Sequence, residues 1–365
     1  MTGHRFIELY SDTKSLPTEA MRRFMMAAPV GDEQKDEDTT TLALCERVAA
    51  MLGQEAAVFL PSGTMCNEIA IAVHCRPGEE VICDATAHIV NFETGGPSAL
   101  SGVMIRMLNG ERGIFTADAL RQAIRPESRY APRSRLVCIE QTANLGGGAI
   151  WPLAVIQEVA QVARQAGLFL HLDGARLLNA AVESKVPAAA YARPFDSTWL
   201  DLTKGLGCPV GAVLAGSRDF IREAWRLKQR WGGAMRQSGI LAAAGLYALD
   251  HHVERLAEDH DNARRLGVGL AAIPGIRLEH ERIETNILYF DIAGTGVTAE
   301  ALVRALKAAG VSMGAFGAHR IRAVTHIGVT AADIDASLGI FRRILSEPAA
   351  DAGLLKANRP ESFPA

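Results

Sequence analysis

The feature that most constrains the fold is an alternation over residues 57–217, where short apolar runs are separated by stretches of helical periodicity. Strands that alternate with helices are typical of an α/β fold with a largely parallel sheet. The stretch 153–166 places its apolar side chains on one face at helical spacing, so we expect a helix there that covers the sheet. The runs predicted to form strands are AAVFL, EVICD, VMIRML, RLVCIE, LFLHLD, STWLDL and GAVLAG.

The chain is long enough for more than one domain. Its 365 residues, 48% of them hydrophobic, exceed the size at which a single core usually divides. We expect a large domain with an N-terminal arm over residues 1–250 and a small C-terminal domain over 251–346. We expect a helical stretch near residues 240–265. After it, the run TNILYFDI, a helix at 298–309 and the run HRIRAVTHIGV indicate both α and β elements in the small domain. Residues 347–365, rich in proline, alanine and charge, are predicted to form a tail.

The charge balance disfavours some classes of partner. The chain has 38 basic and 41 acidic residues, so it lacks the positive field that nucleic acid or an anionic membrane would need, and we expect a small polar metabolite instead. Its 6 cysteines occur singly, without the spacing of a zinc site or a redox dithiol, which suits a reducing cytoplasm. Neither an apolar h-region near the N-terminus nor an apolar run of about 18 residues is present, so we expect a soluble, cytoplasmic protein without membrane contact.

A carboxylate and a lysine follow two of the predicted strands. Asp173 stands at the carboxyl end of LFLHLD, where a carboxylate could keep the nitrogen of a ring cofactor protonated and able to accept electrons. The alternative role is the N-cap of the next helix. Lys204 follows STWLDL, and its apolar and glycine-rich flanks would desolvate the amine and make it nucleophilic towards a carbonyl. A surface lysine is the alternative, but the pairing with Asp173 favours a pyridine-ring cofactor.

The turn Ser62-Gly63-Thr64 lies between a predicted strand and a predicted helix. Free backbone N–H groups at the helix start, two hydroxyls and a glycine would let a phosphate approach closely. Ordinary capping by serine or threonine is the alternative. The turn lacks GxGxxG and the Walker lysine, so a dinucleotide or nucleoside triphosphate site is disfavoured.

Two arginines could bind anionic groups. Arg236 lies beside the glycines of GGAMRQSG, and Arg322 lies in the strand-like run HRIRAVTH. The guanidinium fork suits phosphate and carboxylate, whereas a structural ion pair is the commoner role of an arginine. His251, His252 and His260 do not predict a metal site, because adjacent helix positions point about 100° apart. We therefore expect no metal.

The motifs SDT, PSGTM, AHIVNFETGG, HLDGARL, TKGLGCPVG, GGAMRQ and RAVTH occur in one order between about residues 9 and 345. This series resembles the threonine aldolase family, within the aromatic amino acid β-eliminating lyase/threonine aldolase group of fold-type-I enzymes that use pyridoxal 5'-phosphate. The resemblance implies a fold-type-I, transferase-like α/β fold, with helices on both faces of a mostly parallel central sheet and a smaller C-terminal α+β domain. It also implies active sites shared within dimers and a homotetramer of two such dimers.

The resemblance assigns roles to particular residues. Lys204 would hold the cofactor as a Schiff base, Asp173 would pair with its pyridine nitrogen, and His88 would stack on its ring, so these three form the expected catalytic group. Arg236 would reach the cofactor phosphate from the neighbouring subunit. The implied cofactor-binding set is Ser62, Gly63, Thr64, His88, Asp173, Arg176, Thr203, Lys204 and Arg236. The set that would grip the substrate carboxylate is Ser11, Arg176 and Arg322.

The sequence departs from the family pattern at several positions. Ala143 stands where members commonly have the histidine that contacts the substrate β-hydroxyl, which leaves His88, a bound water or another group as general base. Replacing an imidazole with a methyl would enlarge the pocket, and altered threo/allo discrimination is then expected. The stretch 34–40 reads QKDEDTT and lacks the family's tyrosine, Tyr10 stands where arginine is frequent, and Lys228 is displaced by one position.

The resemblance implies an aldehyde-lyase that cleaves the Cα–Cβ bond of a β-hydroxy amino acid, of the L-threonine or L-allo-threonine type, to glycine and an aldehyde. Three alternatives remain. The first is a β-eliminating lyase, which would yield a 2-oxo acid and ammonia. The second is an aldolase for bulkier or α-substituted β-hydroxy amino acids, and the third is a protein of this fold that has lost catalysis.

Overall fold

The computed structural model describes residues 6–346, and the predicted tail at 347–365 lies outside the described residues. The chain divides into two compact units. Within the described range, the large unit comprises residues 15–257, and the small unit comprises 6–14 together with 258–346. The domain limits expected from the sequence, with a division at 250, remain a proposal.

The large unit is built on a seven-stranded sheet in the order β2-β8-β7-β6-β5-β3-β4. Its strands are β2 (Ala56–Leu60), β3 (Glu80–Asp84), β4 (Met104–Leu108), β5 (Ser134–Glu140), β6 (Phe169–Asp173), β7 (Ser197–Asp201) and β8 (Ala212–Gly216). Each predicted strand is present, and the sheet is mostly parallel as expected. The exception is β8, which runs antiparallel to both of its neighbours, β2 and β7.

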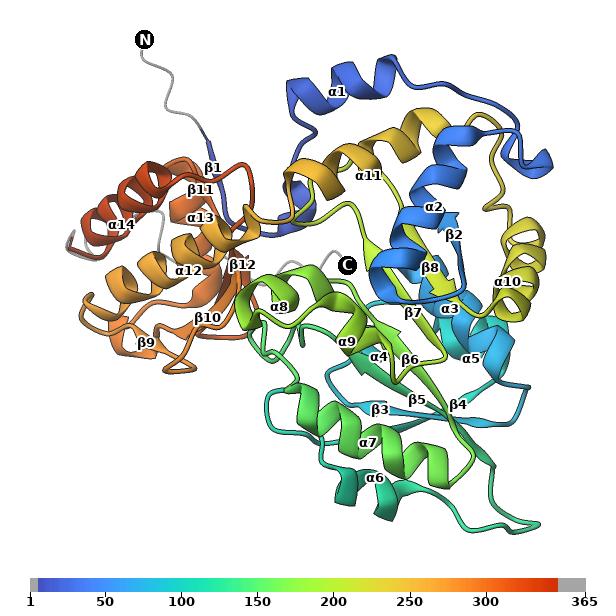
Figure 1. The fold of residues 1–365 in the computed structure, drawn as a ribbon. Helices are drawn as coiled ribbons and strands as arrows, with labels where there is room; N and C mark the ends of the chain where they lie inside the picture. The colour runs from blue at the N-terminus through green and yellow to red at the C-terminus, as the bar shows by residue number, and fades with distance from the viewer. Residues whose placement is uncertain (1–5, 347–365) are drawn as a thin grey trace. The chain divides into compact units, whose positions relative to one another are not determined.

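Helices cover both faces of this sheet (Figure 1), because both faces of its strands are apolar. One face carries α1 (Glu19–Met26), α2 (Thr39–Leu52), α6 (Ala117–Ala123), α7 (Leu153–Gln165), α8 (Leu177–Ser184), α9 (Ala188–Ala192) and α11 (Gly239–His251). The other face carries α3 (Gly63–His74), α4 (His88–Asn91) and α10 (Arg218–Arg230), with α5 (Gly96–Ser101) against α3. A short helix, η2 (Glu33–Lys35), precedes α2. The predicted helix at 153–166 is confirmed as α7.

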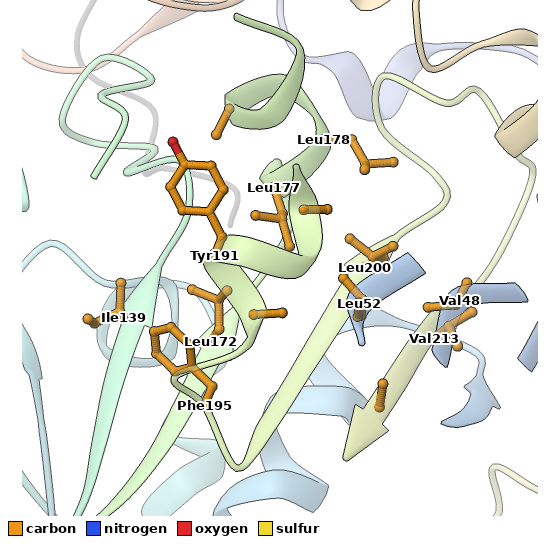
Figure 2. Packing of buried hydrophobic residues seen from close by; sticks show 14 of the residues in the cluster. Val48, Leu52, Ile139, Leu172, Leu177, Leu178, Tyr191, Phe195, Leu200 and Val213 are labelled. Atoms are coloured by element: carbon orange, nitrogen blue, oxygen red, sulfur yellow. The ribbon is translucent and has the colours of Figure 1, made fainter. Parts of the chain in front are cut away.

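Strand β6 shows how the sheet separates its apolar core from its polar residues. Leu170 and Leu172 point into the main core, and Figure 2 shows Leu172 among side chains of α8 and α9, including Leu177 and Tyr191. Because successive side chains of a strand point to opposite faces, His171 points the other way, towards α3. The polar side chains of β6, His171 and Asp173, therefore lie on its α3 face.

The small unit has its own core under a four-stranded antiparallel sheet of order β12-β13-β10-β9. Its elements are β1 (Ile7–Glu8), η1 (Asp12–Lys14), α12 (Leu256–Ala271, which begins in the large unit), β9 (Arg277–Leu278), β10 (Ile287–Asp291), η3 (Ala293–Thr295), α13 (Ala299–Ala308), β11 (Val311–Ser312), β12 (Gly314–Ala315), β13 (Arg320–Val324) and α14 (Ala331–Ser346). Residues 6–14 belong to this unit because β1 pairs with β11 in parallel. The helical stretch expected near 240–265 consists of two helices, α11 and α12.

The topology brings polar residues together at one edge of the large sheet. Strands β5, β6 and β7 are parallel neighbours, so their carboxyl ends lie side by side. Glu140 at the end of β5 stands opposite Asp173 at the end of β6. Asp201 ends β7, three residues before Lys204. In open α/β sheets this edge is where ligands bind.

Candidate active site

Asp173 is a buried carboxylate that is held on both of its oxygens. Its side chain is 4% exposed, its Oδ1 accepts a hydrogen bond from the backbone N–H of Ala175 at 3.0 Å, and its Oδ2 accepts one from Asn67 Nδ2 at 2.9 Å. Burial raises the pKa of Asp173, although the nearby His88 and Lys204 oppose that shift. The N-cap alternative is wrong, because α8 starts at Leu177 and its N-cap position is Arg176.

Glu140 is a second buried acid beside Asp173. Its Oε2 accepts a hydrogen bond from the backbone N–H of His88 at 2.7 Å, and its Oε1 accepts one from that of Asn144 at 2.8 Å. Burial, together with the charge of Asp173, raises the pKa of Glu140 to about 7. No role for Glu140 is predicted from the sequence. Its position at the end of a buried strand, like that of Asp173, was the available signal.

His88 begins α4, and Glu93 orients its ring. The Nδ1 atom of His88 lies 2.7 Å from Oε1 of Glu93, a carboxylate whose side chain is fully buried, while the imidazole is 34% exposed. Burial lowers the pKa of His88, but Glu93, Asp173 and Glu140 together outweigh burial and leave the pKa above its ordinary value. Glu93 lies in the motif AHIVNFETGG, but nothing in that motif marks it as the partner of His88.

Lys204 follows β7 and is paired with an acid. Its Nζ lies 2.9 Å from Oδ2 of Asp201, and its side chain is 14% exposed. The other carboxylate oxygen, Oδ1, accepts a hydrogen bond from the hydroxyl of Thr203 at 2.7 Å. Ser15 donates its hydroxyl to the Lys204 carbonyl at 2.7 Å. The lysine is therefore largely buried, as its apolar flanks suggest, and a carboxylate also fixes its amine.

The turn before α3 has the form expected for a helix start. Ser62 is the N-cap, and its hydroxyl accepts the backbone N–H of Met65 at 3.2 Å, so the capping alternative is confirmed for this residue. Gly63 and Thr64 are the first two residues of the helix, and their N–H groups precede the intrahelical hydrogen bonds. Gly63 is required by packing, because a Cβ there would lie 2.2 Å from the ring of Trp199.

Comparison with known proteins identifies the family of this chain. The model of the family described as beta-eliminating lyase matches residues 8–293. The chain belongs to the beta-eliminating lyase family. It is also 39% identical over 346 residues to low-specificity L-threonine aldolase 1 of Arabidopsis thaliana, which covers 93% of this chain and 97% of that protein.

A bacterial relative and a solved structure agree with this assignment. The low specificity L-threonine aldolase of Escherichia coli K12 is 39% identical over 325 residues, which is 89% of this chain and 95% of that protein. A solved structure of Leishmania major threonine aldolase superposes with a TM-score of 0.80 at 21% identity and covers 93% of this chain and 100% of that one. These findings confirm the resemblance drawn from the motifs and the predicted fold. The chain is thus an enzyme of the lyase class.

Three arginines of this family member differ in their surroundings. Arg176 is buried in the large unit. Arg236 is 61% exposed and pairs with Asp32 at 3.0 Å, so it has the structural partner that the sequence analysis allowed as an alternative. Arg322 is buried in the small unit, where its Nη2 donates to the carbonyl of Tyr10 at 3.2 Å. The anion-binding roles of all three remain predictions.

Ser11 and the departures from the family pattern also have definite positions. Ser11 lies in the small unit, is buried and accepts the hydroxyl of Thr13 at 2.9 Å. Ala143 is 3% exposed, and a Cβ added at Gly113 would lie 2.9 Å from the Cβ of Ala143. The adjoining cavity holds only about 10 Å³. Gly113 therefore lies close to the Ala143 methyl group, and the expected enlargement of the substrate pocket remains a prediction.

Metal-binding clusters and membrane-spanning helices are both absent from residues 6–346. Within residues 6–346 no group of three or more histidine, cysteine or acidic side chains is placed to hold a metal ion. His252 instead uses its Nδ1 to bond the carbonyl of Leu206 at 2.7 Å. In the same described range, every helix is too short or too polar to cross a membrane.

Proposed function

We propose that this lyase uses pyridoxal 5'-phosphate to cleave the Cα–Cβ bond of a β-hydroxy amino acid, of the L-threonine or L-allo-threonine type, into glycine and an aldehyde. The observation that carries the proposal is the buried carboxylate of Asp173 next to Lys204, at the sheet edge where ligands bind. The names and the identities of the Arabidopsis and Escherichia coli relatives support the substrate class.

The residues of the large unit fit this cofactor. Asp173 supplies the buried acid that a pyridine nitrogen needs. Lys204 supplies the amine that an aldehyde needs, and it lies close enough to Asp173 to lower the pKa of that acid. The free N–H groups of Gly63 and Thr64 at the start of α3 suit the phosphate. Thr203 and Arg176 complete the proposed binding set, and Ser11 and Arg322 are proposed to hold the substrate carboxylate.

When bound, pyridoxal 5'-phosphate supplies a protonated ring that withdraws electrons from the bond to be broken at Cα. Asp173 would pair with the ring nitrogen and favour its protonated form, and Lys204 would supply the amine that holds the cofactor's aldehyde group. His88 donates its Nδ1–H to Glu93, so its Nε2 is left to accept the proton of the substrate hydroxyl. Because the carboxylates around His88 raise its pKa, the neutral imidazole is a stronger base than an isolated histidine.

The proposal extends to assembly and location. A homotetramer of two dimers is proposed from the family resemblance, with the exposed Arg236 reaching the neighbouring subunit's cofactor phosphate. A cytoplasmic location is proposed because the described cysteines are all free thiols. A β-eliminating lyase is the second candidate, favoured by the description of the matched family.

Product analysis tests the proposed reaction. The purified protein is incubated with L-threonine, L-allo-threonine, phenylserine and α-methylserine, and the products are identified by mass spectrometry. Glycine with acetaldehyde from the first two substrates is the expected result. A 2-oxo acid and ammonia in place of glycine would instead establish the β-eliminating alternative. Preferential turnover of phenylserine or α-methylserine would favour the aldolase for larger substrates.

A lysine variant tests the site itself. Lys204→Ala is expected to lose at least about a hundredfold in activity, together with the yellow colour of the bound cofactor. Lys307→Ala, at an exposed position of α13, is the matched control and should keep both. Full activity in Lys204→Ala would contradict the assignment.

A further inference from the structure

A buried series of polar side chains connects the far end of α3 to Asp173. His74 Nε2 lies 2.9 Å from Ser197 Oγ, which lies 2.8 Å from His171 Nδ1. His171 Nε2 lies 3.1 Å from Asn67 Oδ1, and Asn67 Nδ2 donates to Asp173 Oδ2 at 2.9 Å. All of these side chains are buried, with Asn67, His171 and Ser197 fully so. The proposed mechanism leaves all of them except Asp173 without a role.

Asn67 is the centre of this series, and its orientation is fixed by a tryptophan. Trp199 Nε1 lies 2.7 Å from Asn67 Oδ1, and an indole nitrogen can only donate. The amide oxygen must therefore face Trp199 and His171. The amide NH₂ then faces two carboxylates, Asp173 at 2.9 Å and Glu93 at 2.7 Å. Asn67 thus donates two hydrogen bonds and accepts two, which is the full capacity of a side-chain amide.

The fixed amide determines the direction of every other hydrogen bond. Because Asn67 Oδ1 accepts, His171 must carry its proton on Nε2, and its Nδ1 must accept from the hydroxyl of Ser197. The Ser197 hydroxyl has only one proton, so His74 must donate to it from Nε2. All donors in the series therefore point towards Asp173. Hydrogen bonds aligned in this way polarise one another in a medium of low dielectric constant.

The series is neutral, so it can act on Asp173 only through oriented dipoles. Burial lowers the pKa of His171 to about 3 and that of His74 to about 4. Both rings therefore stay uncharged at neutral pH and keep the tautomers described above. A neutral donor next to a buried carboxylate favours the ionised form of that carboxylate and opposes the effect of its burial.

We propose that Asn67, supported by His171, is a positioning residue that keeps the Asp173 carboxylate ionised and aimed at the ring nitrogen of the cofactor. The inference rests on the proposed function, because it needs a cofactor with a ring nitrogen. The same amide donates one N–H to Asp173 and the other to Glu93, so it also bridges two buried acids. Asn67 thereby connects Asp173, which would face the ring nitrogen, to Glu93, which orients His88.

The experiment compares two cofactors in binding to the full-length protein freed of cofactor. One is pyridoxal 5'-phosphate, and the other is its analogue with C–H in place of the ring nitrogen. The wild-type protein should prefer the natural cofactor, because only the natural one can pair with Asp173. The preference is expressed as the ratio of the two dissociation constants. Asn67→Leu should reduce this ratio by about tenfold, because the variant loses a hydrogen bond to a charged group. His171→Phe keeps a ring of similar shape but removes the donor to Asn67, so it should reduce the ratio by a smaller factor. This second variant replaces Asn67→Leu in the test if Asn67→Leu does not fold.

Leu170→Ala is the matched control, since Leu170 precedes His171 in β6 and points into the core on the opposite face. This variant should lose stability and leave the preference between cofactors unchanged. Equal losses of affinity for both cofactors in the Asn67 and His171 variants would show a merely structural role and overturn the inference while leaving the proposed function intact. A wild-type protein that binds neither cofactor would overturn the proposed function and the inference with it.

Discussion

Lys228 and Glu33 form an ion pair in the interior of the large unit. Their side chains are 0% and 2% exposed, and Nζ lies 2.8 Å from Oε1. Burial lowers the pKa of Lys228, and Glu33 opposes that shift. The sequence had marked Lys228 only as displaced by one position from a lysine of the family. In the structure it links α10 to the short helix η2, which is a structural role.

Removing one member of this pair should be costly. Lys228→Met keeps the length of the side chain but leaves Glu33 charged and buried without its partner, so the free energy of unfolding should fall by about 3–5 kcal/mol. Denaturant unfolding measures the change. The control is Arg47→Met, because Arg47 and Asp250 form a pair whose side chains are 53% and 59% exposed. That variant should lose no more than about 1 kcal/mol. Equal losses in the two variants would contradict the buried role of Lys228.

At the level of single residues, the sequence located the strand ends that carry Asp173 and Lys204, but not the partners of these two residues. Each of the two follows an apolar strand, which is a local signal. Asn67, Glu93 and Asp201 could not be assigned in the same way. Their roles depend on which elements become neighbours, and a hydrogen bond between α3 and β6 leaves no periodic trace in the sequence.

At the level of elements, short apolar runs were sufficient to locate every strand of the large sheet, because both faces of that sheet are covered. The same property hid the direction of β8. The run GAVLAG is apolar on both faces whichever way it runs, so nothing in it distinguishes a parallel from an antiparallel neighbour. The stretch near 240–265 was predicted as one helical region, whereas it contains an interruption between α11 and α12.

The start of α3 makes a testable prediction about the cofactor phosphate. Gly63 is unsuitable for substitution, because an added Cβ would strike Trp199. Thr64→Val keeps the shape of the side chain and removes its hydroxyl, so the affinity for pyridoxal 5'-phosphate should fall by about threefold to tenfold, as expected for the loss of one hydrogen bond. Affinity for pyridoxal, which has no phosphate, should stay the same. Thr39→Val, at the exposed first residue of α2, is the control and should change neither value. A loss of affinity for pyridoxal as large as that for the phosphate ester would contradict the placement of the phosphate.

For the whole molecule, buried titratable groups act on stability in opposite directions. Burial and neighbouring carboxylates raise the pKa of Glu68 to about 8 and that of Glu140 to about 7. Burial lowers the pKa of His74 to about 4 and that of His171 to about 3. The two acids bind extra protons in the folded state, so their contribution to stability falls as the pH rises from 4.5 to about 8 for Glu68 and to about 7 for Glu140. The two histidines bind fewer protons when folded, so their contribution falls as the pH drops below about 6.5.

Glu68 offers the cleanest test of this balance. It is 3% exposed and lies near Glu93, and its pKa rises on folding from an ordinary value of 4.5 to about 8. The folded protein therefore keeps a proton on Glu68 that the unfolded chain has already lost, and wild-type stability declines across this range. Glu68→Gln mimics the protonated acid at every pH.

The stability of this variant relative to wild type should rise between about pH 5 and pH 8 by at least about 1 kcal/mol, measured by denaturant unfolding of the protein without added cofactor. Glu158→Gln, at an exposed position of α7, should show no such trend. A pH-independent difference between Glu68→Gln and wild type would contradict the raised pKa and mean that Glu68 is already ionised in the fold.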